Sequence, residues 1–271
     1  MDNSLGNKII ELIQQRVVAA AVKTPLRSPL VGFASAHDPI LETLKTEVGP
    51  HHLHPTDLLP EAQTIVVFFL PFGREVVKAS RQWAYVEPVW SRAYVETNRL
   101  IETISTELKQ QLAAWGVKAV EQKPTDNFNP SDLTAVWSHK SMAYVAGLGR
   151  FGLHKMLITA AGVAGRCCSM VISAPIAPTR RPDEEYCLYL RNGTCQQCVH
   201  NCPVGALTVD GLDKQRCWAH QKNKRDPDLE RGCGKCAIGP CAVITDPDIY
   251  LGRVDSRQAK IIGARIEYEN P

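Results

Sequence analysis

The chain has 271 residues, of which 44% are hydrophobic and 22% charged, and its formal net charge is +3. A chain of this length and apolar content buries enough surface to fold without metals or disulfides, which excludes disorder as its dominant state. Its most hydrophobic run, 64–70, is far shorter than the ~20 residues that cross a bilayer, so neither a transmembrane helix nor a membrane partner is expected. The first residues lack a signal-peptide pattern, which favours a cytoplasmic location.

The N-terminal part is predicted to mix α and β structure. Apolar residues recur at helical spacing over 9–18 and again from Tyr94 to about Trp115, where Gly116 ends the second helix. Short β-branched and aromatic runs at 30–34 and 64–70 are typical of buried strands.

Residues 130–173 are predicted to contain a helix start, a short helix and two strands. Pro130-Ser131 indicates a helix start, and residues 140–146 read as a helix. Residues 156–159 and 168–173 are predicted to be two strands joined as a hairpin by the glycine-containing turn at 160–165.

The composition changes over residues 174–183, where three prolines and a pair of arginines interrupt regular structure. We therefore divide the chain into an α/β domain at 1–180, a cysteine-rich domain at 181–245 and a tail at 246–271 that packs back on the body. The middle segment has no long apolar run, so metal must supply part of its folding free energy.

The cysteines are concentrated late in the chain. None of the ten lies in the first 166 residues, and eight lie between 187 and 241. A cluster of cysteines close together in the sequence of a protein from a reducing compartment more often binds metal than forms disulfides. The adjacent Cys167 and Cys168 lie in a predicted strand and are expected to be small buried hydrophobes.

The spacing of the late cysteines indicates iron–sulfur clusters. Residues 195–203 read C-x2-C-x3-C-P, the second half of the bacterial ferredoxin run, in which the last cysteine serves a second cluster. Eight thiolates suffice for two [4Fe–4S] clusters. We assign the first cluster to Cys195, Cys198 and Cys241, and the second to Cys202, Cys217, Cys233 and Cys236.

The first cluster lacks a ligand at the regular place, because Asn192 stands three residues before Cys195. Cys187 is the candidate fourth ligand, and an incomplete cluster or an open iron is the alternative. Structural zinc is a further alternative, since two C-x2-C pairs also fit a zinc ribbon. The neighbouring histidines His51, His52 and His54 suggest a metal site as well, although loop histidines more often face solvent.

Residues 147–152 satisfy G-x-G-x-x-G, but a dinucleotide-binding fingerprint also needs a preceding strand and a later acid. Here a predicted helix precedes the glycines, and no acid follows at the required distance. The glycines therefore indicate close backbone approach to a large ligand, or tight packing of helix on sheet.

Taken together, these motifs resemble the epoxyqueuosine reductases, a family of cobalamin-dependent iron–sulfur enzymes. Residues 146–152 (AGLGRFG) resemble the family's glycine loop, 59–66 (LPEAQTIV) its entry to a strand, and the cysteine segments follow in the same order. The resemblance implies an α+β fold with a nitroreductase-like N-terminal domain and a C-terminal two-cluster ferredoxin-like domain. It further implies a cobalamin between them that receives electrons from the clusters.

The resemblance also implies site residues. The cobalamin-binding candidates are Ala146, Gly147, Leu148, Gly149, Gly152 and His154. The catalytic candidates are Asp132, His139 and Lys140, where the family has an acid followed by a Glu-Arg pair, so the chain departs from the pattern. The alternatives are a satisfied core histidine at 139, a helix-capping aspartate at 132 and a solvated or anion-pairing cation at 140.

The expected function is reduction of an unknown substrate by a cobalamin-dependent iron–sulfur reductase. The substrate is a small molecule, a tRNA or a corrinoid protein, and the electron donor a low-potential ferredoxin or flavodoxin. Residues 214–235 carry seven cations against three acids, which favours docking of an acidic carrier or a phosphate backbone. The alternative is an electron-transfer protein, or a reductive activator of a corrinoid protein, without its own substrate site.

Overall fold

The computed structural model describes residues 4–82, 88–125, 127–222 and 232–251. Its centre is a four-stranded antiparallel sheet in the order β1-β2-β8-β3. The bounds of these strands are Leu30–Ser35 for β1, Thr64–Pro71 for β2, Gly165–Ile172 for β8 and Ala119–Glu121 for β3. The class is therefore mixed α/β, as the sequence predicts.

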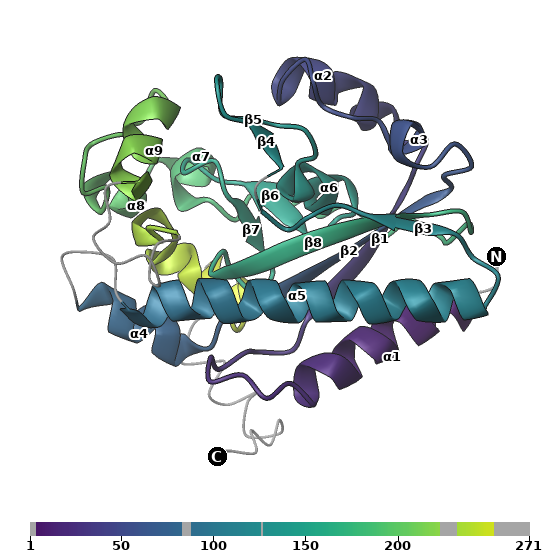
Figure 1. The fold of residues 1–271 in the computed structure, drawn as a ribbon. Coiled ribbons are helices and arrows are strands. Elements are labelled where there is room, and N and C mark those ends of the chain that lie inside the picture. The colour runs from purple at the N-terminus through teal and green to yellow at the C-terminus, as the bar shows by residue number, and fades with distance from the viewer. Residues whose placement is uncertain (1–3, 83–87, 126, 223–231, 252–271) are drawn as a thin grey trace.

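Helices cover both faces of this sheet (Figure 1). The long helix α5 (Pro88–Ala114) and α1 (Ser4–Val18) share a core with Val66, Phe68 and Leu70 of β2. The intervening residues of β2 join a second core with α6 (His139–Val145) on the opposite face. Successive side chains of a strand point to opposite faces, so covering both faces explains why β2 is buried throughout.

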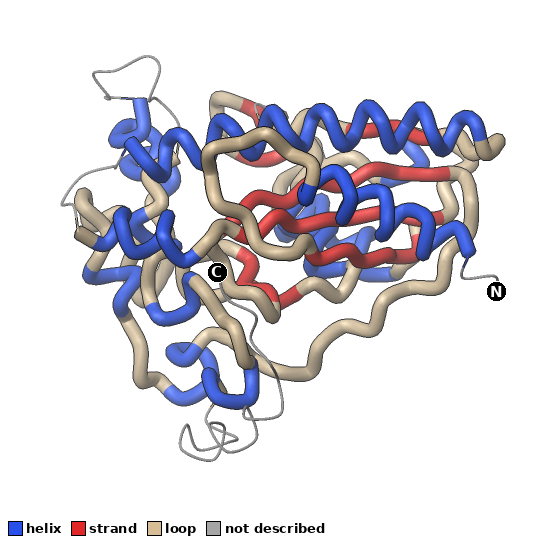
Figure 2. The backbone as a smooth tube through the Cα atoms, turned by 90° about the horizontal axis from the view of Figure 1, so that it is seen from below, coloured by secondary structure: helices blue, strands red, loops and turns tan. Residues whose placement is uncertain are grey.

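Short elements complete the chain, and most of the later ones lie beyond one end of the sheet (Figure 2). The N-terminal ones are η1 (Pro39–Thr43), α2 (Leu44–Glu47), α3 (Pro55–Leu58) and α4 (Arg74–Arg81). Two hairpins follow, formed by β4 (Phe128–Asn129) with β5 (Thr134–Ala135) and by β6 (Gly149–Phe151) with β7 (Leu157–Thr159). The last ones are α7 (Leu188–Asn192), α8 (Gln197–His200), α9 (Lys214–Lys222), η3 (Lys235–Ala237), η4 (Pro240–Ala242) and α10 (Pro247–Tyr250).

The cysteine-rich segment shares its core with the body. Phe72, Val76 and Trp90 belong to the same buried cluster as Cys198 and Ala242. Backbone hydrogen bonds from Val163, Ala164 and Ile244 join segment 161–164 to segment 241–244. The packing therefore fastens this segment to the end of the sheet, while the division into domains remains a prediction.

Several predicted elements are confirmed, among them α1, β1, β2 and α6, whereas α5 begins at Pro88 rather than near Tyr94. The hairpin predicted after Met156 is wrong. β7 pairs with β6, and β8 lies between β2 and β3, because β8 completes the central sheet. No described helix is long and apolar enough to cross a membrane.

The start of the predicted C-terminal tail packs back on the body. The Tyr250 hydroxyl donates a hydrogen bond to the Tyr186 carbonyl at 2.9 Å, and Leu251 is buried. The rest of the tail, 252–271, lies outside the described residues.

Candidate metal centre

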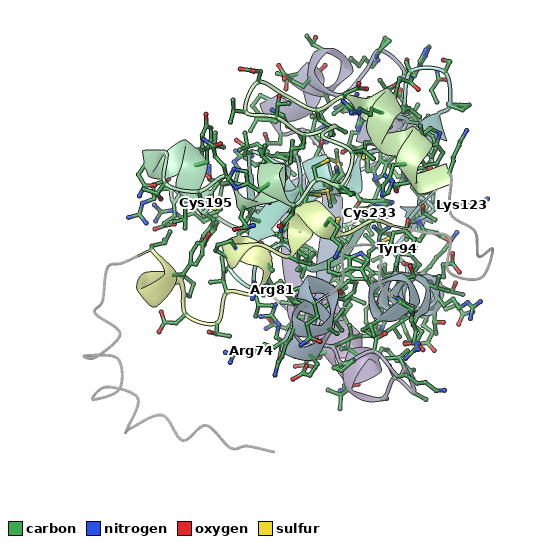
Figure 3. The ribbon with its side chains drawn as sticks, turned by 90° about the vertical axis from the view of Figure 1, so that its left-hand side faces the viewer. Arg74, Arg81, Tyr94, Lys123, Cys195 and Cys233 are labelled. Carbon is green, nitrogen blue, oxygen red and sulfur yellow. The ribbon has the colours of Figure 1, made fainter. Side chains whose placement is uncertain are left out.

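The eight late cysteines lie in the part of the chain that carries α7, α8, α9, η3 and η4, beyond the end of the sheet; Figure 3 looks onto this end and labels Cys195 and Cys233. All of these thiols are free of disulfides. Four form a first group. Burial, followed by the charges of Cys187, Cys198 and Cys195, raises the pKa of Cys241 to about 12. Burial, then Cys187, raises the pKa of Cys198 to about 11.

A second group surrounds Cys236. Burial raises the pKa of this thiol to about 12, and the charges of Cys233 and Cys217 add to the shift. Cys198 also contributes, so the two groups are neighbours. Cys202 is not among the thiols that act on Cys236; its sulfur accepts a hydrogen bond from the Ala206 amide at 3.2 Å.

The donor set fits iron–sulfur clusters. Burial and mutual repulsion oppose ionisation of these thiols, and bound metal cations reverse that opposition because a coordinating thiol is deprotonated outright. Two [4Fe–4S] clusters take four thiolates each, which matches the eight free cysteines between residues 187 and 241. A single structural zinc site takes only four ligands, so the number of thiols favours clusters over zinc.

Nitrogen donors surround the cysteine sulfurs. The Leu153 amide lies 3.4 Å from the Cys187 Sγ, and the Gln221 amide nitrogen lies 3.5 Å from the Cys217 Sγ. His154 Nε2 lies 3.5 Å from the Cys241 sulfur. Hydrogen bonds to sulfur are one of the factors that set the potential of an iron–sulfur cluster.

The glycine loop between α6 and β7 packs on the chain itself. A Cβ at Gly149 would lie 2.1 Å from the Ile158 carbonyl oxygen. At Gly147, whose φ is +73°, it would lie 2.6 Å from the Arg180 carbonyl oxygen. The cavity beside this loop measures about 320 Å³, at the small end for drug-sized ligands. Of the two sequence interpretations, these contacts agree with tight packing of the loop, and its role in binding a corrinoid stays a prediction.

His139 lies in the core at the start of α6. Its Nε2 donates to the Lys123 carbonyl at 2.8 Å, and its Nδ1 accepts from the Ser169 amide at 3.0 Å. Burial lowers the pKa of this imidazole to about 4. Because both ring nitrogens are used by the backbone, the geometry favours a structural histidine over a general acid.

The other two catalytic candidates lie in different surroundings. Asp132 is exposed at the β4–β5 turn, where its Oδ1 accepts from the Thr134 amide at 2.9 Å and hydroxyl at 2.6 Å; these bonds hold its pKa below the usual value. The predicted helix start is wrong, because this segment forms a hairpin. Lys140 Nζ donates to the Lys155 carbonyl at 3.2 Å.

Lys140 is the catalytic candidate that the structure brings toward the cysteines. Burial lowers the pKa of its amine, and the nearby Cys167 and Cys236 thiols oppose that shift. Burial lowers the pKa of His154 to about 4, and the positive charge of Lys140 adds to this shift. The candidates at 140 and 154 therefore share surroundings with the predicted cluster ligands.

Sequence reasoning missed the contribution of α4. Arg81 donates to the carbonyls of Ile238 and Gly239 at 2.6 and 2.8 Å, and the buried Lys235 donates to the Ser80 carbonyl at 2.8 Å. Arg81 is labelled beside the cysteine loops in Figure 3. These contacts fix the loop that carries Cys236, and no local motif in α4 signals them.

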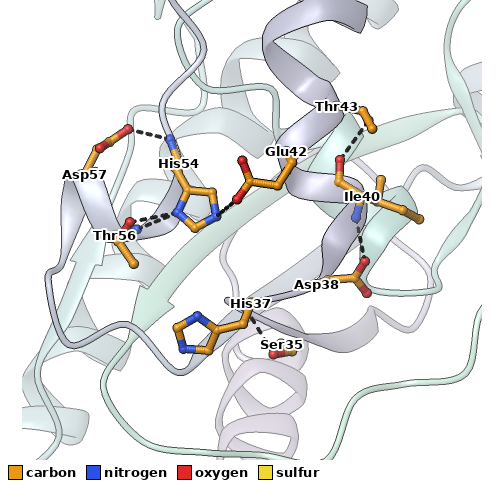
Figure 4. A network of polar contacts seen from close by, with 9 residues as sticks. All are labelled: Ser35, His37, Asp38, Ile40, Glu42, Thr43, His54, Thr56 and Asp57. Atoms are coloured by element: carbon orange, nitrogen blue, oxygen red, sulfur yellow. Dashed lines mark hydrogen bonds and ion pairs between the residues drawn. The ribbon is translucent and has the colours of Figure 1, made fainter.

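Two of the three histidines near residue 52, His52 and His54, have structural roles. The His54 ring caps α3, accepting from the Thr56 amide at 3.3 Å, while its own amide donates to Asp57 at 2.8 Å (Figure 4). His52 is buried, and its Nε2 accepts from the Ser138 amide at 3.0 Å. This arrangement does not support the metal site that the three histidines suggested.

No family model matches the chain. Among curated proteins, it is 23% identical over 237 residues to the epoxyqueuosine reductase of Listeria monocytogenes, covering 79% of this chain and 58% of that protein. It is 32% identical over 96 residues to the one from Yersinia pestis, covering 35% and 22%. The chain thus spans less than two thirds of the curated relatives it matches.

Solved structures show the same fold. An epoxyqueuosine reductase with an epoxyqueuosine-modified tRNA-Tyr stem loop matches with a TM-score of 0.59 at 18% identity, covering 95% of this chain and 74% of that chain. A catabolic reductive dehalogenase matches with a TM-score of 0.59 at 13% identity, covering 98% and 42%. The fold is therefore that of epoxyqueuosine reductases and reductive dehalogenases. The sequence matches add a low-identity similarity to the epoxyqueuosine reductases over most of the chain.

Proposed function

We propose that the chain is an iron–sulfur oxidoreductase with a nitroreductase-like body over residues 1–180 and a two-cluster ferredoxin-like part over residues 181–245. The observation that carries the proposal is the gathering of buried and half-buried, disulfide-free thiols into two adjacent groups. The likeness to epoxyqueuosine reductases, named as reductases, supports the same class of reaction.

In this proposal Cys187 completes the first cluster together with Cys195, Cys198 and Cys241. The second cluster is held by Cys202, Cys217, Cys233 and Cys236. Bound clusters supply one-electron transfer at potentials that their surroundings set. The chain itself orients the thiolates, donates N–H groups to their sulfurs and excludes water through the shared apolar core.

The proposed electron acceptor is a corrinoid, and its support comes from relatives. One matching structure is described as suggesting a mechanism for B12-dependent dehalogenation. In this proposal the corrinoid binds at the glycine loop, residues 146–152. Lys140 lies between the β6–β7 loop and the thiols, since its amine donates to the Lys155 carbonyl and lies toward both Cys167 and Cys236.

Among the predicted substrates, the matching structure with a tRNA stem loop favours tRNA. A Bacillus subtilis relative is described with its catalytic aspartate loop swung out of the active site. We propose that Asp132, exposed on the β4–β5 hairpin, is the corresponding acid and that the hairpin moves inward when substrate binds.

The second candidate is an electron-transfer protein without its own substrate site, reduced in the cytoplasm by a ferredoxin or flavodoxin. It is favoured by α9, where exposed Lys214 and Arg216 lie on the same helix as Cys217. An acidic carrier docking there would reach the second cluster directly. The remaining part of the predicted basic segment, 223–231, lies outside the described residues.

Anaerobic purification tests the proposal. The protein should be brown and contain about eight irons and eight sulfides per chain; a colourless zinc protein contradicts it. Added cobalamin, followed by its optical spectrum as the clusters are reduced, separates the two candidates. Binding and reduction of the corrinoid support the reductase, whereas absence of binding supports the electron-transfer protein.

A further inference from the structure

His154 has a fixed orientation toward the first group of cysteines. It lies in the loop between β6 and β7 with only 4% of its surface exposed. Its Nδ1 accepts a hydrogen bond from the Met156 amide at 3.1 Å. In a neutral imidazole the other nitrogen then carries the proton. That nitrogen, Nε2, lies 3.5 Å from the Cys241 sulfur, so its N–H is directed at the sulfur.

Leu153, the residue before His154, directs an N–H at a second thiol. The backbone N–H of Leu153 lies 3.4 Å from the Cys187 sulfur, and the Leu153 side chain is buried. Cys187 and Cys241 belong to the same group of four thiols. One dipeptide of the body therefore directs two N–H donors at two sulfurs of one proposed cluster.

We propose that His154 is a positioning residue that raises the reduction potential of the cluster held by Cys187, Cys195, Cys198 and Cys241. This inference rests on the proposed function, because it requires that the cluster forms. Reduction adds one electron to the cluster and moves no proton. The added negative charge makes the sulfurs better acceptors, and charge-assisted hydrogen bonds are roughly twice as strong as neutral ones.

The effect is confined to one cluster. In the second group, the Cys202 sulfur accepts from the Ala206 backbone amide and the Cys217 sulfur from the Gln221 side-chain amide. The burial of His154 strengthens its bond, since water does not compete for the imidazole. Removal of the imidazole should therefore move one potential and leave the other in place.

The test is a reductive titration of the intact, cluster-loaded protein under anaerobic conditions, followed by EPR. His154→Leu removes the donor and keeps an apolar side chain in the core. His154→Gln retains a side-chain N–H. His200→Leu is the matched control, because His200 lies between two cysteines but is exposed on α8.

We expect His154→Leu to shift one of the two midpoint potentials to a more negative value, His154→Gln to shift it less, and His200→Leu to leave both unchanged. Unchanged midpoints in His154→Leu with full iron and sulfide overturn the inference while the cluster assignment stands. Wild-type protein without iron and sulfide overturns the proposed function instead.

A loss of the cluster in His154→Leu does not end the test. Wild-type protein labelled with 15N-histidine is then reduced and measured by pulsed EPR. Coupling of one histidine nitrogen to a reduced cluster, absent in His154→Gln, supports the inference, and no such coupling in wild type overturns it.

Discussion

His139 makes the folded chain sensitive to acid. Its Nε2–H is bound to the Lys123 carbonyl and its Nδ1 to the Ser169 amide, so the fold accommodates the neutral ring. Burial lowers its pKa from 6.5 to about 4. The unfolded chain therefore binds this proton at a higher pH than the folded chain. Its stabilising effect is complete above pH 6.5 and is lost as the pH falls toward 4.

A shift of this size costs about 2 kcal/mol of unfolding free energy between pH 7 and pH 5. Anaerobic urea unfolding, followed by tryptophan fluorescence, measures it in wild type and in His139→Gln, whose amide stays neutral at both pH values. Wild type should lose about 2 kcal/mol more than the variant over this interval. His154 has a lowered pKa too, but it is present in both proteins and cancels.

Equal losses in the two proteins would refute the assignment of His139 as a buried neutral group. The catalytic alternative would be restored if His139→Gln kept the wild-type unfolding free energy at pH 7 but lost the reductase activity. The structural assignment instead expects destabilisation at pH 7 of about 1–3 kcal/mol, because a buried hydrogen-bonding group loses its partner.

Two further variants test the metal centre and the glycine loop. Cys187→Ser should lower the iron content from about eight to about seven per chain as one cluster loses an iron, or abolish that cluster, while Cys167→Ser should leave the content unchanged; equal iron in both variants contradicts the assignment. Gly149→Ala places a methyl group 2.1 Å from a backbone carbonyl and should cost about 1–3 kcal/mol in thermal unfolding. Gly211→Ala, with open space around its Cβ, should cost less than about 0.5 kcal/mol, and equal costs refute the packing interpretation.

Most predictions that depend on neighbours along the chain agree with the structure; the helix start at Pro130 and the hairpin after Met156 are the exceptions. The apolar spacing of α1 and the continuous apolar run of β2 are local patterns, and each element forms where its pattern lies. The C-x2-C spacing is local as well, so the gathering of Cys195 and Cys198 could be read from the sequence. The position of Cys187 beside Cys241 could only be suggested, because more than 50 residues separate the two thiols.

The sequence by itself determined the mixed α/β class, the main helices and strands, and a thiol-rich region suited to clusters. Only the tertiary structure decided that β8 joins the central sheet, that the glycine loop packs on its own backbone, and that His139 serves the core. It also directed His154 at a cysteine 87 residues away. Such roles arise from contacts between segments that are distant in the sequence. The hydropathy, spacing and propensity of a short stretch do not predict those contacts.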